Sequence, residues 1–145
     1  MKTRHNIAIG DTTAERVKIN VGSALTELDE PPANYPVHGR DLMTGIPKEI
    51  VVTYKEIAAA MNNSIEQIEE AIMSALFKTP PELSADIYNT GLYLTGGGSM
   101  LRGLDKRISL KTKLPVYVAE DPLRAVARGT GIALKNIEKF PFLIK

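Results

Sequence analysis

The chain has 145 residues, of which 43% are hydrophobic and 24% are charged. Its 18 Lys and Arg residues nearly balance its 17 Asp and Glu residues, which argues against a nucleic-acid-binding protein that acts by neutralising phosphates. The absence of cysteine excludes a disulfide framework, a thiol nucleophile and a thiolate zinc site, and is typical of a reducing cytosol. No apolar run approaches the roughly 20 residues that a membrane span requires. We therefore expect a cytoplasmic protein of mixed α/β class.

The N-terminal half is predicted to form a helix followed by a β-hairpin. Thr12 and Glu15 have the spacing of a capping box, which predicts a helix that begins near Asp11 and continues with apolar residues at helical intervals. An acidic loop with two prolines follows. Residues 35–41 and 46–54 then have the composition of two short strands, and the glycine and proline between them predict a hairpin.

A long helix is predicted after the hairpin. Thr53 and Glu56 repeat the capping-box spacing, and the proline pair at residues 80 and 81 ends the helix. Its apolar stripe consists of Ile57, Met61, Ile65, Ile68, Ile72 and Leu76. Three glutamates on the other faces are expected to stay in solvent: Glu66, Glu69 and Glu70.

The C-terminal third is predicted to alternate strands and helices. Residues 91–95 and 115–119 are interpreted as strands buried on both faces, and the helix between them makes them parallel neighbours. A last helix is expected to begin at Asp121, and its small residues predict tight packing on the sheet: Ala125, Ala127, Gly129 and Gly131. Two parallel strands need further neighbours, so we expect either a partner chain or a longer polypeptide to complete the sheet.

The strongest candidate site is the glycine run Gly96, Gly97 and Gly98, between a strand and a helix. Glycines let a backbone approach a flat ring or an anion closely, and ligands of open α/β sheets bind at the carboxyl ends of parallel strands. The alternative is a tight turn, but a turn needs only one glycine. Because the run lacks both a P-loop and a dinucleotide fingerprint, we expect it to contact a nucleotide's base and sugar rather than its phosphates.

Charged residues offer weaker candidates. Glu15 and Lys18 lie three residues apart on one helix face and could hydrogen-bond a ribose hydroxyl and a purine edge, although an ordinary ion pair is the better interpretation of these residues alone. Arg124 and Arg128 could bind an anion, but a solvated face is favoured. A basic patch opposed only by Asp105 could meet an acidic partner or simply face solvent: Arg102, Lys106, Arg107, Lys111 and Lys113.

Catalysis and metal binding find no support in the sequence. His5 and His38 lie in unrelated contexts without a paired carboxylate or serine motif, and no metal-ligand spacing is present. Three aspartates are interpreted as turn or cap residues: Asp41, Asp86 and Asp121. The apolar segment 140–145 could pack on the body of the protein or contact a partner or a bilayer.

Several long motifs, in order, resemble the C-terminal part of the MreB family of bacterial actin-like proteins, which determine rod shape. The resemblance runs from about Lys2 to Asn136 and is carried by residues 10–19, 39–47, 79–83, 94–105, 119–123 and 126–129. It implies an α/β, actin-like ATPase (ribonuclease-H-like) fold, present as a C-terminal fragment with an inserted small α+β subdomain. The implied divisions are the end of a truncated core helix, a small outer subdomain, and part of the core with the adenosine motif: residues 1–10, 11–78 and 79–145.

The resemblance also implies a ligand, partners and a location. MreB proteins bind ATP, self-associate into filaments at the inner face of the membrane and guide the cell-wall synthesis machinery. Residues of this chain that match the family's nucleotide-contacting motifs are Glu15, Arg16, Lys18, Gly96, Gly97, Gly98, Ser99 and Met100. A full member is more than twice this long and carries two phosphate-binding hairpins and a catalytic acid upstream. We therefore expect this chain alone to lack catalytic residues, Mg²⁺ ligands, ATP hydrolysis and filament formation.

Two alternatives remain open at this point. The chain could be half of another actin-fold enzyme that uses adenine nucleotides, such as a sugar kinase or a heat-shock chaperone, although residues 10–80 carry no sugar-binding pattern. It could also be a non-catalytic adaptor domain that uses the basic patch and the apolar C-terminal segment.

Overall fold

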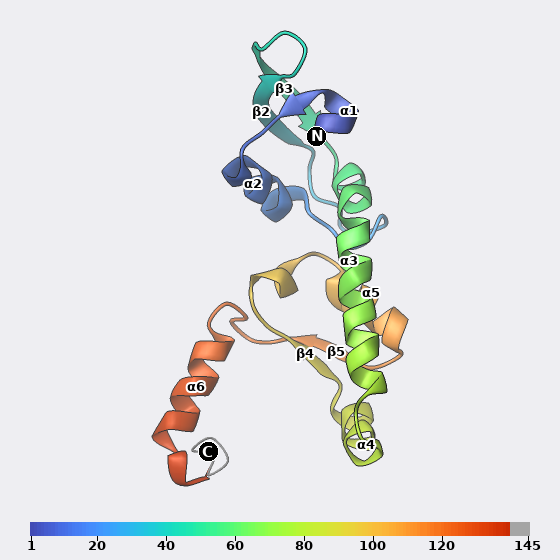
Figure 1. Ribbon diagram of the computed structural model, residues 1–145, viewed down its shortest axis with the longest axis vertical. Coiled ribbons are helices and arrows are strands. Elements are labelled where there is room, and N and C mark those ends of the chain that lie inside the picture. The colour runs from blue at the N-terminus through green and yellow to red at the C-terminus, as the bar shows by residue number, and fades with distance from the viewer. Residues whose placement is uncertain (140–145) are drawn as a thin grey trace.

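The long helix α3 runs beside two smaller units, one near each of its ends, in the computed structural model of the chain (Figure 1). The structure describes residues 1–139. In chain order the elements are α1 (Lys2–His5), β1 (Ile7–Ala8), α2 (Asp11–Val21), β2 (Tyr35–Asp41), β3 (Pro47–Val52), α3 (Tyr54–Phe77), α4 (Pro81–Thr90), β4 (Leu92–Leu94), the 3-10 helix η1 (Gly97–Met100), α5 (Leu104–Thr112), β5 (Val116–Val118), α6 (Ala125–Lys135) and the 3-10 helix η2 (Ile137–Lys139).

The first unit, called here the hairpin unit, comprises β1, α2, β2 and β3. Strands β2 and β3 form the predicted antiparallel hairpin, in register from Tyr35 opposite Val52. Strand β1, which the sequence did not predict, adds a third antiparallel strand beside β2. Helix α2 packs on this sheet, and the buried cluster consists of Val17, Val21, Val37 and Val52.

The two predicted capping boxes have different outcomes. At α3 the box is complete, because Thr53 Oγ1 accepts a hydrogen bond from the Glu56 amide at 3.3 Å and Glu56 Oε2 accepts one from the Thr53 amide at 3.0 Å. At α2 the predicted box is wrong. The N-cap residue there is Gly10, so Thr12 lies inside the helix and no side chain caps it.

Helix α3 belongs to both units. It is continuous through Asn62 and Ser64, as predicted, and Ile57 packs against the cluster of the hairpin unit. Farther along, Ile65 joins a second buried cluster with Ala24, Leu104 and Ile108. The apolar stripe departs from the prediction at Ile68, which is exposed. The prediction that Glu69 stays in solvent is also wrong, because an arginine of α5 reaches it.

The second unit, called here the glycine-loop unit, comprises β4, η1, α5 and β5. Strands β4 and β5 pair in parallel, in register from Leu92 opposite Val116, with α5 in the connection between them, as predicted. The chain also forms α4 between α3 and β4. Asp86 therefore lies inside a helix rather than at a turn or a cap, as the sequence had suggested.

Three further predictions about the C-terminal third are wrong: the burial of its strands, the start of its last helix and the packing of that helix. The strands are not buried on both faces, since Tyr93 is 67% exposed and its ring lies tilted beside that of Tyr117, with ring centroids 5.3 Å apart. The last helix begins at Ala125 and not at Asp121. Asp121 adopts a left-handed backbone (φ 49°), and its carbonyl accepts a hydrogen bond from the Arg124 amide at 3.0 Å in a turn.

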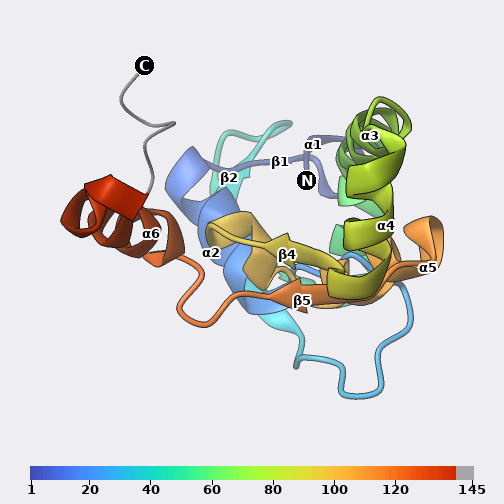
Figure 2. The same cartoon turned by 90° about the horizontal axis from the view of Figure 1, so that it is seen from below.

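Nor does the last helix pack tightly on the sheet. Helix α6 has no buried residue and stands apart from the two units (Figures 1 and 2). A Cβ added at Gly129 or Gly131 would meet nothing within 4 Å, so these glycines serve no close packing among the described residues. The apolar segment 140–145 lies outside the described residues.

Candidate functional site

The glycine run forms a tightly held loop at the carboxyl end of β4. Gly96 has a φ of 79°, a conformation that favours glycine, and its amide donates a hydrogen bond to the Pro122 carbonyl at 2.8 Å. Ser99 Oγ donates to the Gly96 carbonyl at 2.7 Å, and Ser99 is only 6% exposed. The Ser99 hydroxyl is therefore engaged in shaping the loop, and the Gly96 amide is not available to a ligand.

The outer surface of the loop is bare backbone. A Cβ added at Gly96 or Gly98 would meet nothing within 4 Å, and one added at Gly97 would only approach Leu123 Cδ2 at 3.4 Å. Gly98 has no positive φ, so neither its conformation nor its neighbours require glycine. Beside it, Met100 is 60% exposed. A flat apolar group could therefore lie directly against this backbone.

The other predicted site residues lie on α2. Lys18 Nζ pairs with Glu15 Oε2 at 2.8 Å, and both side chains are about half exposed. Arg16, also exposed, lies between them in the sequence. No hydrogen bond or ion pair joins Glu15 or Lys18 to the glycine loop within residues 1–139, so a shared role requires a ligand that contacts both.

The C-terminal end of helix α2 is nevertheless hydrogen-bonded to the glycine-loop unit. Arg102, which follows η1, donates through Nη1 to the carbonyls of Ile19 at 3.1 Å and Gly22 at 3.4 Å. The Ala24 amide donates a hydrogen bond to the Arg102 carbonyl at 2.8 Å, and Ser23 and Arg102 form an isolated parallel β-bridge. These contacts join the C-terminal end of α2 to the segment that directly follows the glycine loop. Both lie on the same side of α3 in each view (Figures 1 and 2).

The predicted basic patch is divided among separate partners. Lys106 Nζ pairs with Asp29 Oδ2 at 2.9 Å, and this hydrogen bond and charge lower the pKa of Asp29 and raise the pKa of Lys106. Arg107 pairs with Glu69, and Arg102 binds main-chain carbonyls. Four of the five cations are exposed, as a solvated face requires, and only Arg107 is largely withdrawn from solvent.

The remaining candidates, His5, His38 and Arg124, each lie beside an acidic side chain of this chain. His5 Nε2 lies 3.2 Å from Glu56 Oε1, His38 Nε2 lies 2.7 Å from Glu49 Oε2, and Arg124 Nε lies 3.0 Å from Asp121 Oδ2. The expectation that neither histidine has a paired carboxylate is therefore wrong, because strand pairing and the start of α3 bring glutamates beside them. Among residues 1–139 no three His, Asp or Glu side chains gather as a metal site. In the same part of the chain, no helix combines the length and the apolar character needed to cross a bilayer.

Sequence reasoning missed how the two units are joined. The arginines at the joint lie within the predicted basic patch, but their partners are carbonyls and a glutamate 38 to 83 residues away in the chain. Main-chain acceptors leave no residue-type signal, so no sequence pattern could have identified the contacts to carbonyls.

Comparisons with known proteins agree with the motifs. The family model described as MreB/Mbl protein matches residues 1–141. The chain is 41% identical over 141 residues to the cell shape-determining protein Mbl of Bacillus subtilis, covering 97% of this chain and 42% of that protein. It is also 41% identical over 138 residues to the cell shape-determining protein MreB of Escherichia coli, covering 95% of this chain and 39% of that protein.

A solved structure shows the same fold. MreB5 of Spiroplasma citri bound to ADP superposes with a TM-score of 0.88 at 37% identity, covering 95% of this chain and 41% of that one. This likeness confirms the predicted α/β, actin-like fold class. The chain spans about two fifths of the length of the curated relatives it matches. With a family model matched along nearly its whole length, the chain belongs to the MreB/Mbl family.

Proposed function

We propose that this chain is the part of an actin-like, cell-shape-determining protein that binds the adenosine end of ATP. The observation that carries the proposal is the bare backbone at Gly98, which neither conformation nor packing explains. The solved Spiroplasma citri relative is bound to ADP, which supports an adenine nucleotide as the ligand. Membership of the MreB/Mbl family decides against the sugar-kinase and chaperone alternatives.

The residues present suit a base and a ribose. In the proposed complex, the adenine ring lies against Gly96 to Gly98, with the exposed Met100 side chain beside it. From α2, the Glu15 carboxylate accepts hydrogen bonds from ribose hydroxyls, while the Lys18 ammonium donates to ring nitrogen or ribose oxygen. Arg16 lies at the outer edge of this contact. Ser99 contributes by holding the loop shape through its bond to Gly96.

We assign no residue of this chain to the phosphates or to Mg²⁺. Residues 1–139 bring together no group of three acidic or histidine side chains that could hold a metal ion by themselves. Most of the binding free energy of this chain toward ATP should therefore come from the base and the ribose. Adenosine should compete with ATP for the chain, and inorganic triphosphate should not.

At the level of the whole protein, we propose that bound nucleotide governs self-association into filaments that lie against the inner face of the cell membrane and guide the cell-wall synthesis machinery. The names of the curated relatives, as cell shape-determining proteins, support this role. For this chain alone we expect no filaments with ATP and Mg²⁺, and electron microscopy checks this. Well-ordered double filaments would contradict the proposal that filament contacts need surfaces from both halves of a longer protein.

The binding site itself is tested by titrating a fluorescent ATP analogue into the chain and two glycine variants. Gly98→Val places a side chain where the ligand should lie, without backbone strain, so we expect an affinity at least about tenfold lower, or about 1.4 kcal/mol. Gly129→Ala is the matched control, because it adds a methyl group in equally open space on α6. No binding by the wild type, or equal binding by Gly98→Val, would contradict the proposal.

A further inference from the structure

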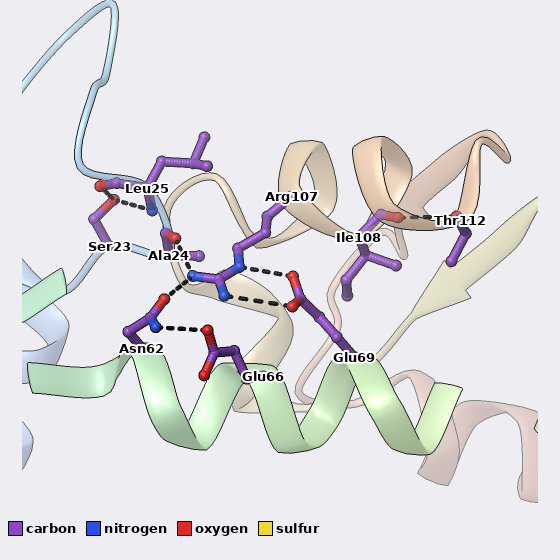
Figure 3. Close-up of polar contacts among 9 residues, drawn as sticks. All are labelled: Ser23, Ala24, Leu25, Asn62, Glu66, Glu69, Arg107, Ile108 and Thr112. Carbon is purple, nitrogen blue, oxygen red and sulfur yellow. Dashed lines mark hydrogen bonds and ion pairs between the residues drawn. The ribbon is translucent and has the colours of Figure 1, made fainter. Parts of the chain in front are cut away.

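Arg107 makes a buried junction between three segments of the chain (Figure 3). From α5, its Nε donates to Glu69 Oε1 at 2.7 Å and its Nη2 donates to Glu69 Oε2 at 3.4 Å. Its Nη1 donates to Asn62 Oδ1 at 2.8 Å and to the Ala24 carbonyl at 3.0 Å. Glu69 and Asn62 belong to α3, whereas Ala24 lies in the connection between α2 and β2.

Only a guanidinium can make this set of contacts. All three side-chain nitrogens are used, and their fixed planar arrangement matches the two oxygens of a carboxylate. The Arg107 side chain is 17% exposed and the Glu69 side chain 8%, so solvent screens the pair little. A lysine at position 107 would keep the charge but could not reach the carboxylate, the amide oxygen and the carbonyl together.

The junction acts on the segment that carries α2. Residues 22–25, called here the α2 connection, are held by Arg107 at Ala24 and by Arg102 at Gly22. Ser23 Oγ, in addition, donates toward the Leu25 carbonyl at 2.7 Å. Since α2 ends at Val21, immediately before this segment, the direction in which α2 leaves the glycine-loop unit depends on these contacts.

We propose that Arg107 is a positioning residue for the nucleotide site. It sets the separation between α2, with Glu15 and Lys18, and the glycine loop, although it touches neither. Its effect on binding rests on the proposed function, whereas its effect on the geometry of the two units stands without a ligand. A site whose two sides belong to different units binds well only if those units are held at a fixed spacing.

The alternative is that the Arg107–Glu69 pair serves packing alone. The two roles can be separated, because a buried ion pair can often be replaced by apolar residues of similar volume without loss of stability. The double variant Arg107→Leu with Glu69→Leu should keep α3 packed on α5 but removes the hydrogen bonds to Ala24 and Asn62. If the pair serves packing alone, the double variant should match the wild type in every measurement. If Arg107 positions α2, the variant should differ from the wild type.

Spin labels can report the separation of α2 from α5 directly. The chain has no cysteine, so Asn20→Cys and Lys111→Cys, both exposed, provide a unique pair of attachment points on the full 145-residue chain. Lys106→Gln is the matched control, because it removes an exposed ion pair of the same helix, of a kind that contributes little. Circular dichroism and thermal unfolding establish that each variant is folded.

We expect one narrow distance distribution in the wild type and in Lys106→Gln. A broad or double distribution is expected in the folded Leu–Leu variant and in Arg107→Lys. In the same variants, affinity for the fluorescent ATP analogue should fall about tenfold, a typical coupling between separate sites. An unchanged distribution in the folded Leu–Leu variant would overturn the proposal.

The nucleotide measurement distinguishes the two proposals. If the distribution broadens and affinity stays constant, Arg107 does not position this site and the inference fails while the proposed function stands. If the wild type binds no nucleotide, the proposed function fails. The role of Arg107 in nucleotide binding then fails with it, even if the distance distribution changes in the variants.

Discussion

The hairpin unit and the glycine-loop unit differ in how completely each covers its own apolar surface. In the hairpin unit, three strands and α2 enclose a cluster of valines, and Ile7 and Val52 have no exposed surface. In the glycine-loop unit the sheet has two strands, both tyrosines are exposed, and the adjoining α6 has no buried residue. Since apolar burial is the main source of stability, the first unit should be the more stable of the two.

The candidate site lies at the joint between these unequal units. The joint combines a buried apolar cluster, which includes Ala24, Ile65 and Leu104, with arginine side chains that donate to carbonyls and to one glutamate. Such bonds fix direction and distance but bury little surface. The comparison therefore separates two tasks: apolar clusters stabilise the units and their joint, and the directional hydrogen bonds of the arginines set how the units face each other.

The largest expected effect contrasts one buried and one exposed isoleucine. Ile7→Ala in β1 should lower the free energy of unfolding by about 2–5 kcal/mol, because it leaves a cavity in the enclosed hairpin unit. Ile132→Ala in α6 should change it by no more than about 0.5 kcal/mol, because that side chain is exposed. Urea denaturation measures both values, and equal losses would show that α6 is packed as firmly as β1.

Removal of helix caps tests the two capping-box patterns. Thr53→Ala should destabilise the chain by about 1 kcal/mol, because it removes the acceptor for the Glu56 amide. Thr12→Ala should have almost no effect, since Thr12 caps nothing. Thermal unfolding of the pair checks this, and a comparable loss for Thr12→Ala would mean that α2 begins later than Asp11.

A smaller effect is expected from Gly129→Ala in α6. Alanine in a helix interior is favoured over glycine by up to about 1 kcal/mol, and space is open at this position. Because α6 has no buried residue, the gain should remain local. Amide hydrogen exchange should slow in α6 and stay constant in β2 and β3. Slower exchange in the hairpin unit as well would show that α6 is coupled to it.

Acid should weaken the hairpin turn through Asp41. The amides of Met43 and Thr44 and the ammonium of Lys48 bond its carboxylate, and the Met43 amide has the largest part in lowering the pKa of Asp41 to about 2, below its ordinary 3.8. The stabilisation is thus complete above pH of about 4 and is lost as pH falls toward about 2. Asp41→Asn should remove this part of the pH dependence. If the free energy of unfolding of Asp41→Asn depends on pH between these values as steeply as that of the wild type, this role of Asp41 is contradicted.

The elements that the sequence predicted well carry local signals. The bounds of β2, the complete cap at Thr53 and the parallel pairing of β4 with β5 follow from residue type and spacing within short segments. Thr12 has the same spacing as Thr53, but Gly10 takes the cap position at α2. Spacing alone therefore does not determine which residue begins a helix.

What the sequence could not predict depends on partners far along the chain. Glu69 lies off the apolar stripe of α3 and was expected in solvent, but Arg107 makes its burial favourable. Small residues in α6 suggested a close neighbour that is not found among residues 1–139. For the candidate site, the position of the glycine loop could be predicted, whereas its spacing from α2 could not. The ligand roles of Glu15, Arg16, Lys18 and Met100 remain predictions.

The central claim is that one ligand lies against both α2 and the glycine loop. Nuclear magnetic resonance of the labelled chain during titration with ADP tests it most directly, through the amide signals of Glu15, Lys18, Gly97 and Gly98. We predict that signals from both segments shift together and give a single dissociation constant. Shifts confined to one segment, or two different dissociation constants, would contradict the account.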